Sequence, residues 1–388
     1  MTTATTSPSK ASEKKVNTLA AGRLSKQTNY LMLIGSFVVS AIIFGLIWMT
    51  SDKPFLSVNE RTDMLTVNFN WGGWMLLAAI LYLVGIYWLS RTVEGERQAK
   101  NRLVSGLLTT AFILAMIPLA SLLFSLLVRG IPGLGLPHFF TDDASTPGEK
   151  GALHAIIGTL WITLITTLIS VPIGIFTAIY LVEYGKGNWL SRALNFFVDV
   201  MTGVPSIVAG LFAFALFTLL VKSTGGDITN IRSGFVGAIA LMVLMIPTVV
   251  RSAEEMIRLV PDELREASFA LGVTKWRTIA LVVLPTCLAG LVTGVLLAIA
   301  RVIGETAPLL VAAGFSINMN SNPFEGLMTS LPVFVYNQHS GSFQLVGASK
   351  DEAVLLAWGS ALILLIIVLL LNALGRLVSH YFSPKGNR

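Results

Sequence analysis

The chain is 388 residues long, 54% of its residues are hydrophobic, and only 12% are charged. Its mean hydropathy is +0.75, which excludes an ordinary soluble globular protein and indicates a protein that crosses a lipid bilayer. The net charge of +6 does not require a nucleic-acid surface, because basic residues also accumulate on the cytoplasmic side of membrane proteins.

Eight apolar stretches are long enough to cross a bilayer. The spans are predicted at about 31–49, 72–90, 103–128, 154–182, 193–221, 234–257, 283–311 and 353–378. With a cytoplasmic N-terminus, nineteen of the 27 lysines and arginines fall in inside segments and seven in outside segments. This asymmetry fits the positive-inside rule with both termini in the cytoplasm. The predicted fold class is therefore an all-α integral membrane protein, a polytopic bundle of eight helices.

The spans fall into two groups. Residues 1–29 are rich in Thr, Ser, Ala and Lys and are predicted to be a disordered cytoplasmic N-terminus. Residues 30–102 are predicted to be an accessory transmembrane hairpin and a basic linker, since neither span contains an interior proline. The other six spans lie in a core at 103–380, followed by a cytoplasmic tail at 381–388. Five of these six carry a proline, and broken helices of this kind mark pathways in transporters.

The segment Thr202-Gly203-Val204-Pro205-Ser206 lies within the predicted span 193–221. Gly203 and Pro205 can unwind this span, which would expose backbone N–H groups and the hydroxyls of Thr202 and Ser206 to an anion. A simple packing kink is an equally good interpretation. Thr202 and Ser206 are therefore weaker candidates for a substrate pathway.

A charged stretch, PDELREASFALGVTKWRTIALVVLP at 261–285, separates two spans and is too polar for lipid. A short helix is predicted at 261–277, because Pro261 suits a first helical position and the acidic residues after it favour a helix N-terminus. Gly272 is a natural helix stop. Residues at i, i+3, i+4 and i+7 spacing give this helix one small and apolar face: Leu264, Ala267, Ser268 and Leu271.

Arg301 and Glu305 are the strongest candidates for a substrate site. They lie in ARVIGETAPLL, within the predicted span 283–311, where a charge is costly and usually faces a cavity or a partner. Their i, i+4 spacing places both on one helix face, and a guanidinium suits a tetrahedral oxyanion. The alternative is a structural ion pair. Arg251, at the cytoplasmic end of its span, fits either a pathway residue or a positive-inside anchor.

Motifs for catalysis and for nucleotide or metal binding are missing from the sequence. No Gly-x4-Gly-Lys-Ser/Thr phosphate loop occurs, and the four histidines show no metal-ligand spacing. No Ser/His/Asp arrangement suggests catalysis, and the single cysteine, Cys287, lies within a predicted span. We expect a non-catalytic chain without a cofactor of its own, whose energy comes from a partner.

Part of the charged stretch resembles the cytoplasmic EAA loop of type I ABC importer permeases. The matching positions are Glu266, Ala267, Ser268, Gly272, Val282, Leu284 and Pro285. Ser268 and Val282 replace the family's Ala and Ile. In that family the loop forms the coupling helix that docks into a cleft of the ATPase subunit. The resemblance therefore implies a permease core of six spans. It also implies that the chain couples to the ATPase through Glu266, Ala267, Ser268 and Gly272. An ordinary amphipathic surface helix is the alternative.

Longer segments closely resemble the phosphate permeases of this family. They are MIPTVVRSAEEMIRLVPDELREASFALG at 245–272 and ARVIGETAPLL at 300–310, and GVPSIVAG at 203–210 agrees with the same pattern. The resemblance implies a permease subunit of an ATP-driven phosphate importer in the bacterial plasma membrane, with Arg251 and Arg301 along the phosphate path. It implies as partners a homologous permease subunit, a dimer of ATPase subunits that binds ATP and Mg²⁺, an external phosphate-binding protein and the lipid bilayer.

Three alternatives stay open. A permease for another oxyanion, such as sulfate or molybdate, would share this layout. An ion-coupled secondary transporter should show internal repeats, and no convincing repeat is visible. A membrane scaffold or sensor that only binds an ATPase would use Arg301 as a structural residue. The outer loop 314–352 could carry a short helix where a binding protein docks, or it could pack against a gate.

Overall fold

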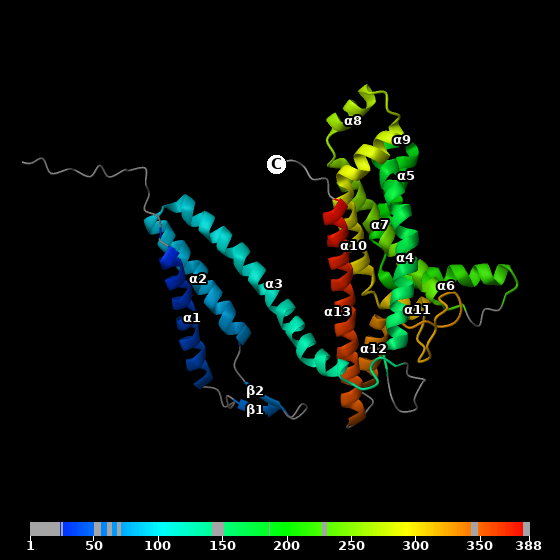
Figure 1. The fold of residues 1–388 in the computed structure, drawn as a ribbon. Helices are drawn as coiled ribbons and strands as arrows, with labels where there is room; N and C mark the ends of the chain where they lie inside the picture. The colour runs from blue at the N-terminus through cyan, green and yellow to red at the C-terminus, as the bar shows by residue number, and fades with distance from the viewer. Residues whose placement is uncertain are drawn as a thin grey trace, which may run out of the picture. The chain divides into compact units, whose positions relative to one another are not determined.

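The computed structural model describes residues 24, 26–49, 56–59, 64–67, 71–141, 151–185, 187–226, 231–342 and 348–382. Within these ranges the chain is helical apart from loops and one antiparallel hairpin of β1 (Leu56–Asn59) and β2 (Met64–Val67). Eight helical stretches are long and apolar enough to cross a membrane. The predicted class, an all-α protein with eight spans, is confirmed (Figure 1).

The described residues form thirteen α-helices. In chain order they are α1 (Lys26–Met49), α2 (Trp71–Val93), α3 (Glu96–Leu134), α4 (Leu153–Ile179), α5 (Trp189–Thr202), α6 (Ser206–Ser223), α7 (Gly234–Arg258), α8 (Asp262–Ala270), α9 (Lys275–Thr278), α10 (Leu284–Val302), α11 (Ala307–Ala312), α12 (Leu331–Ser342) and α13 (Ala348–Phe382). Two π-helical turns extend this set: η1 (Tyr180–Tyr184) continues α4, and η2 (Ile279–Val283) joins α9 to α10.

The chain divides into two compact units, residues 1–122 and 123–388. The sequence suggested a boundary at residue 102, after a basic linker, but the division falls inside α3. The reason is that most of the linker is helical: α2 ends at Val93, Gly95 turns the chain with a φ of 91°, and α3 starts at Glu96. Glycine adopts this left-handed conformation without a steric penalty.

The bounds of the predicted N-terminal segment and C-terminal tail also differ from the prediction. The first helix, α1, begins at Lys26, so the last four residues of the segment 1–29 are helical. Apart from Leu24, the rest of that segment lies outside the described residues. At the other end, α13 continues to Phe382, and the remainder of the predicted tail also lies outside them.

In the first unit, one buried carboxylate organises the turn between α2 and α3. Glu94 accepts hydrogen bonds from the backbone N–H of Leu24 at 2.8 Å, from Ser90 Oγ at 2.7 Å and from Arg102 at 2.6 and 2.7 Å. Burial by itself raises the pKa of Glu94, but these hydrogen bonds outweigh burial and keep the pKa below its usual value. The turn is therefore held by a satisfied, ionised group.

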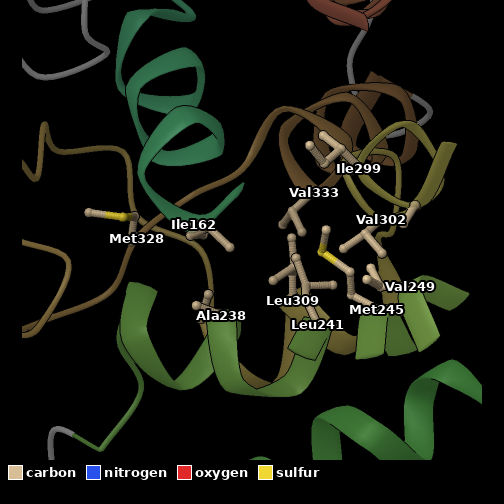
Figure 2. Packing of buried hydrophobic residues seen from close by; sticks show 12 residues of the cluster. Ile162, Ala238, Leu241, Met245, Val249, Ile299, Val302, Leu309, Met328 and Val333 are labelled. Atoms are coloured by element: carbon tan, nitrogen blue, oxygen red, sulfur yellow. The ribbon is translucent and has the colours of Figure 1, made fainter. Parts of the chain in front are cut away.

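In the second unit, a buried hydrophobic cluster joins helices that are far apart in the sequence. It includes Ile162 of α4, Leu241 and Met245 of α7, Val302 of α10 and Leu309 of α11. Figure 2 shows these side chains converging from their different helices. Because α7 supplies residues along its length and is more than half buried, it forms the centre of this unit.

Two helix breaks interrupt the predicted spans. The predicted span 193–221 is in fact two helices, because α5 ends before residues 203–205 and α6 starts after them, and α6 runs across the direction of α4 and α13 in Figure 1. Pro205 lacks an N–H group and disfavours a helical residue before it. The predicted span 283–311 starts earlier, at Lys275, and stops at Val302; residues 303–306 then separate α10 from α11. These are called the α5–α6 break and the α10–α11 break.

The close contact between Gly158 and the backbone of Thr329 in the second unit can be tested by a glycine-to-alanine substitution. A Cβ atom added at Gly158 in α4 would lie 2.0 Å from the carbonyl oxygen of Thr329, whereas one added at Gly45 in α1 would meet nothing within 4 Å. Both glycines are inside helices, where alanine is intrinsically better by about 1 kcal/mol. Gly158→Ala should therefore lower the thermal unfolding midpoint of the detergent-solubilised protein, and Gly45→Ala should keep or raise it. Equal midpoints for the two variants would contradict this contact.

Candidate substrate pathway and coupling loop

Arg251 of α7 is bonded to three side chains. Its Nη1 donates to Asn195 Oδ1 at 3.1 Å and to Glu254 Oε2 at 2.7 Å, and its Nη2 donates to Asp199 Oδ1. Asn195 and Asp199 belong to α5, so one guanidinium joins α5 to α7. Glu254 also accepts a hydrogen bond from Arg258 at 2.6 Å. The positive charge of Arg251 is therefore closely compensated by carboxylates within the chain.

The α5–α6 break and the α10–α11 break lie close together. Gly210 of α6 packs against the backbone of α11, since a Cβ added there would lie 2.7 Å from Pro308 Cα. Further along the same two helices, Ala213 and Ala312 share one buried cluster. The two helices thus run side by side in the same direction, and their N-terminal ends, which follow the two breaks, are neighbours.

The hydroxyls at the α5–α6 break are only partly engaged. Thr202 Oγ1 donates to the carbonyl oxygen of Asp199 at 2.6 Å, whereas Ser206 Oγ has no hydrogen-bond partner among the described residues. The predicted unwinding of this span is confirmed. Asp199 also accepts a hydrogen bond from Arg251. Thr202 therefore lies one helical turn from a direct partner of Arg251.

Arg301 and Glu305 lie on either side of a helix end. Arg301 is exposed in the last turn of α10, while Glu305 is partly exposed in the α10–α11 break. The expectation that both share one helix face is wrong, because α10 ends at Val302, one residue after Arg301. Glu305 is therefore not part of this helix. In the described part of the chain, neither side chain forms an ion pair or a hydrogen bond, and a Cβ added at Gly304 would meet nothing within 4 Å. An uncompensated guanidinium beside open space can receive an anion.

Sequence reasoning missed the partners of Arg251. Asn195, Asp199 and Glu254 were not among the candidate residues, although the structure places all three around its guanidinium. A signal was present in the sequence, because Asp199 is an acidic residue within a predicted span, and ionisable residues in spans are costly unless they are paired or functional.

The candidate coupling loop consists of α8, α9 and the turn between them. Pro261 is the N-cap residue, Asp262 and Glu263 lie in the first turn of α8, and Gly272 ends the helix with a φ of 75°. The helix stop at Gly272 is confirmed, but the single helix predicted at 261–277 is two helices, α8 and α9, because the chain turns between them. A left-handed φ at this position favours glycine over any residue with a Cβ.

The outer surface of the loop is more apolar than its charge suggests. Leu271 is 83% exposed and Trp276 is 54% exposed, and Glu266 and Ala267 are exposed as well. Ser268 does not belong to this surface: it is buried, and its hydroxyl shares a hydrogen bond of 2.8 Å with Thr278 Oγ1. The expectation that Ser268 contributes directly to the apolar face is wrong, because it holds α8 onto α9.

Arg265 anchors the candidate coupling loop to the membrane helices. Its guanidinium donates to Glu183 Oε1 in η1 at 3.0 Å, to the carbonyl oxygens of Ile257 and Val260 at 2.9 and 2.6 Å, and to Asp262 Oδ1 at 3.0 Å. The Arg265 and Glu183 side chains are only 11% and 8% exposed, so this ion pair is largely shielded from water. The arginine thus links α8 to the ends of α4 and α7.

A second cation reinforces the same junction. Lys275 donates to the backbone carbonyl of Glu183 and lies 4.7 Å from the centre of the Tyr184 ring. Both η1 and η2 meet here, and Ile179, Ile257 and Ile279 share a buried cluster around them. π-helical turns inside α-helices are frequent at functional sites. No group of three His, Cys, Asp or Glu side chains in the described ranges could hold a metal ion.

Comparisons with known proteins define the class of this membrane protein. The family model described as "Binding-protein-dependent transport system inner membrane component" matches residues 170–387. A crystal structure of a bacterial alginate ABC transporter, in complex with an alginate pentasaccharide-bound periplasmic protein, contains a chain with a TM-score of 0.52 and 16% identity. The alignment covers 72% of this chain and 96% of that chain. These matches, together with the broken helices and the loop, define an ABC importer permease fold.

The particular family follows from sequence identity. The phosphate transport system permease protein PstA 1 of Mycobacterium tuberculosis is 43% identical over 286 residues, which cover 73% of this chain and 89% of that protein. The phosphate transport system permease protein PstA of Pasteurella multocida is 40% identical over 298 residues, covering 76% and 99%. The chain belongs to the PstA family of permeases.

Replacement of the two carboxylate partners of Arg265 should lower the free energy of unfolding by different amounts. Glu183→Gln leaves a shielded cation without its buried counter-charge, which typically lowers the free energy of unfolding by about 3 kcal/mol. Asp262→Asn removes a partner whose side chain is 82% exposed, so its cost should stay below about 1 kcal/mol. Denaturation in matched detergent micelles would compare the two variants. A larger loss for Asp262→Asn would contradict the assigned role of Glu183.

Proposed function

We propose that this chain is the permease subunit of an ATP-driven importer of inorganic phosphate, in which it forms half of the translocation pathway. The observation that carries the proposal is the exposed guanidinium of Arg301, which has no partner among the described residues and sits at a helix break. A planar fork of donors matches a tetrahedral oxyanion. The named relatives, which are phosphate transport permeases, support phosphate as that oxyanion.

The two candidate arginines differ in availability. Arg251 is engaged by Asp199 and Glu254, whereas Arg301 is not compensated within the described chain. We assign Arg301 to phosphate contact and Arg251, with Thr202 and Ser206 nearby, to the polar wall of the pathway. A pathway with few free charges favours release, since a site that binds too tightly would stall conduction. Glu305 forms no ion pair with Arg301 among the described residues; in this proposal its carboxylate accepts a hydrogen bond from a protonated phosphate oxygen, which would help to exclude sulfate.

Energy would enter through the coupling loop. In this proposal Glu266, Ala267 and Gly272, with the exposed Leu271, meet a cleft of the ATPase subunit, while the buried Ser268 keeps α8 in place. Because Arg265 ties α8 to α4 and α7, movement of the loop would be passed to the helix that carries Arg251. The chain itself is not an enzyme and holds no cofactor; ATP and Mg²⁺ would bind the ATPase partners.

The remaining partners follow from the same assembly. A homologous permease subunit would face Arg301 and complete the pathway, since this chain leaves that residue exposed. An external phosphate-binding protein would deliver substrate, and the structural neighbour that contains a periplasmic protein supports such a partner. The chain would lie in the bacterial inner membrane with both termini in the cytoplasm, as the distribution of basic residues favours.

Transport by reconstituted importer should depend on Arg301. Loss of a charged hydrogen-bond donor costs about 1.5–3 kcal/mol, which corresponds to a roughly 10- to 100-fold fall in phosphate uptake for Arg301→Ala. Arg192→Ala, which removes an exposed arginine of α5 outside the pathway, should leave uptake unchanged.

Glu305→Gln should reduce discrimination between phosphate and sulfate in a competition assay. Unchanged uptake in both Arg301→Ala and Glu305→Gln would remove the proposed site, and stronger competition by molybdate or sulfate than by phosphate would favour another oxyanion.

Association with the ATPase should depend on the exposed apolar tip of the loop. Leu271→Ser removes its most exposed leucine, so we expect the ATPase subunit to be lost from the affinity-purified complex. Leu369→Ser, at a position of α13 that is 58% exposed, should leave co-purification intact. If the ATPase co-purifies equally with both variants, the coupling assignment fails. Uptake by proteoliposomes that contain this chain alone would instead indicate a secondary transporter.

A further inference from the structure

The first unit contains a groove that the transport mechanism does not use. It has a volume of about 540 Å³ and is lined by residues of α1, α2 and α3, all within residues 29–117. Pockets of this size between helices, with mostly apolar walls and a few polar groups, are typical of small-molecule sites. This unit carries the additional hairpin that precedes the residues matched by the family model.

The groove has a polar end and an apolar end. Asn29, Asn101 and Arg102 line the end near the α2–α3 turn, whereas Phe37 and Ile117 line the other end. From Arg102 to Ile117 the helix rises about 20 Å, which is most of the roughly 30 Å hydrocarbon thickness of a bilayer. An amphipathic molecule aligned with the membrane normal would match this gradient.

The length of the groove suits a single extended hydrocarbon chain. The groove has a volume of about 540 Å³ and follows α3 for about 20 Å, so a chain aligned with the helices would lie along its apolar lining.

Charge at the polar end selects the headgroup. Arg102 is compensated by Glu94, and Lys100 pairs with Glu96 at 2.8 Å. Arg91 and Arg97 do not line the groove, but both are exposed on either side of the same turn and form no ion pair among the described residues, so they remain as excess positive charge there. Basic sites at the cytoplasmic ends of transmembrane helices attract anionic lipid headgroups.

We propose that the groove binds one anionic phospholipid, with an acyl chain between α1, α2 and α3 and the phosphate near Arg91 and Arg97. Asn101 and Ser105 side chains have no hydrogen-bond partner among the described residues and lie at the polar end, where they would donate to the ester carbonyls. The bound lipid would fill the space between the accessory hairpin and α3. This inference does not depend on the identity of the transported substrate.

Native mass spectrometry of the full chain, purified with equal amounts of phosphatidylglycerol and phosphatidylcholine, tests the proposal. The wild type should retain one phosphatidylglycerol in preference to phosphatidylcholine. Ala79→Phe fills the groove from α2 and should abolish that retention. Ala111→Phe makes the same change at an exposed position of α3 outside the groove and should behave like the wild type. Arg91→Gln with Arg97→Gln should lower the preference for phosphatidylglycerol by roughly 30-fold.

Ser105→Phe provides a second groove-filling variant at an exposed position, in case Ala79→Phe does not fold. Equal retention of the two lipids by the wild type would overturn the proposal. Undiminished phosphatidylglycerol retention in a folded groove-filling variant would do so as well. A photoreactive residue at Ile113 that cross-links to a polypeptide of the assembled importer, and not to lipid, would show that another protein occupies the groove.

Discussion

The second unit depends on where the Arg265 guanidinium finds its acceptors. Two of them, the carbonyl oxygens of Ile257 and Val260, are in the last turn of α7 and just beyond it, where a cation is stabilised by the helix dipole. A third acceptor, Glu183, is at the end of α4. One side chain thereby fixes a loop outside the bilayer to two transmembrane helices. A rotation of either helix would therefore displace Arg265.

The same helix, α7, connects this junction to the polar network around Arg251. It packs in the cluster of Figure 2 through Leu241 and Met245 and carries Arg251 between that cluster and the loop. Close-packed interiors transmit displacements because they have few voids into which a side chain can relax. A shift of α8 would therefore reach the Arg251–Asp199 contact through a continuous path of packed groups. In the proposed importer, that path connects nucleotide hydrolysis by a partner to the substrate pathway.

The sequence was sufficient for the features that depend on local chemistry. Long apolar runs predicted eight spans, Gly203 and Pro205 predicted an interrupted helix, and Gly272 predicted the end of α8, because each of these properties is decided by the residue itself or by its neighbours. It was insufficient where tertiary contacts decide. The side of α8 that faces inward is set by the bond between Ser268 and Thr278, and helical periodicity alone could not distinguish that face from the exposed one.

The end of α10 shows the same limit at the candidate site. The stretch from Leu297 to Leu310 is apolar except for Arg301, Glu305 and Thr306, so its hydrophobicity predicts one helix, whereas the chain turns at residues 303–306. This turn separates Arg301 from Glu305, which a continuous helix would have placed on one face. The consequence is chemical, because a carboxylate held against the guanidinium would cancel the charge that an oxyanion needs. With the two groups apart, Arg301 keeps its full charge, and the cost of placing that charge in a membrane must be met by an anion, by water or by a second subunit.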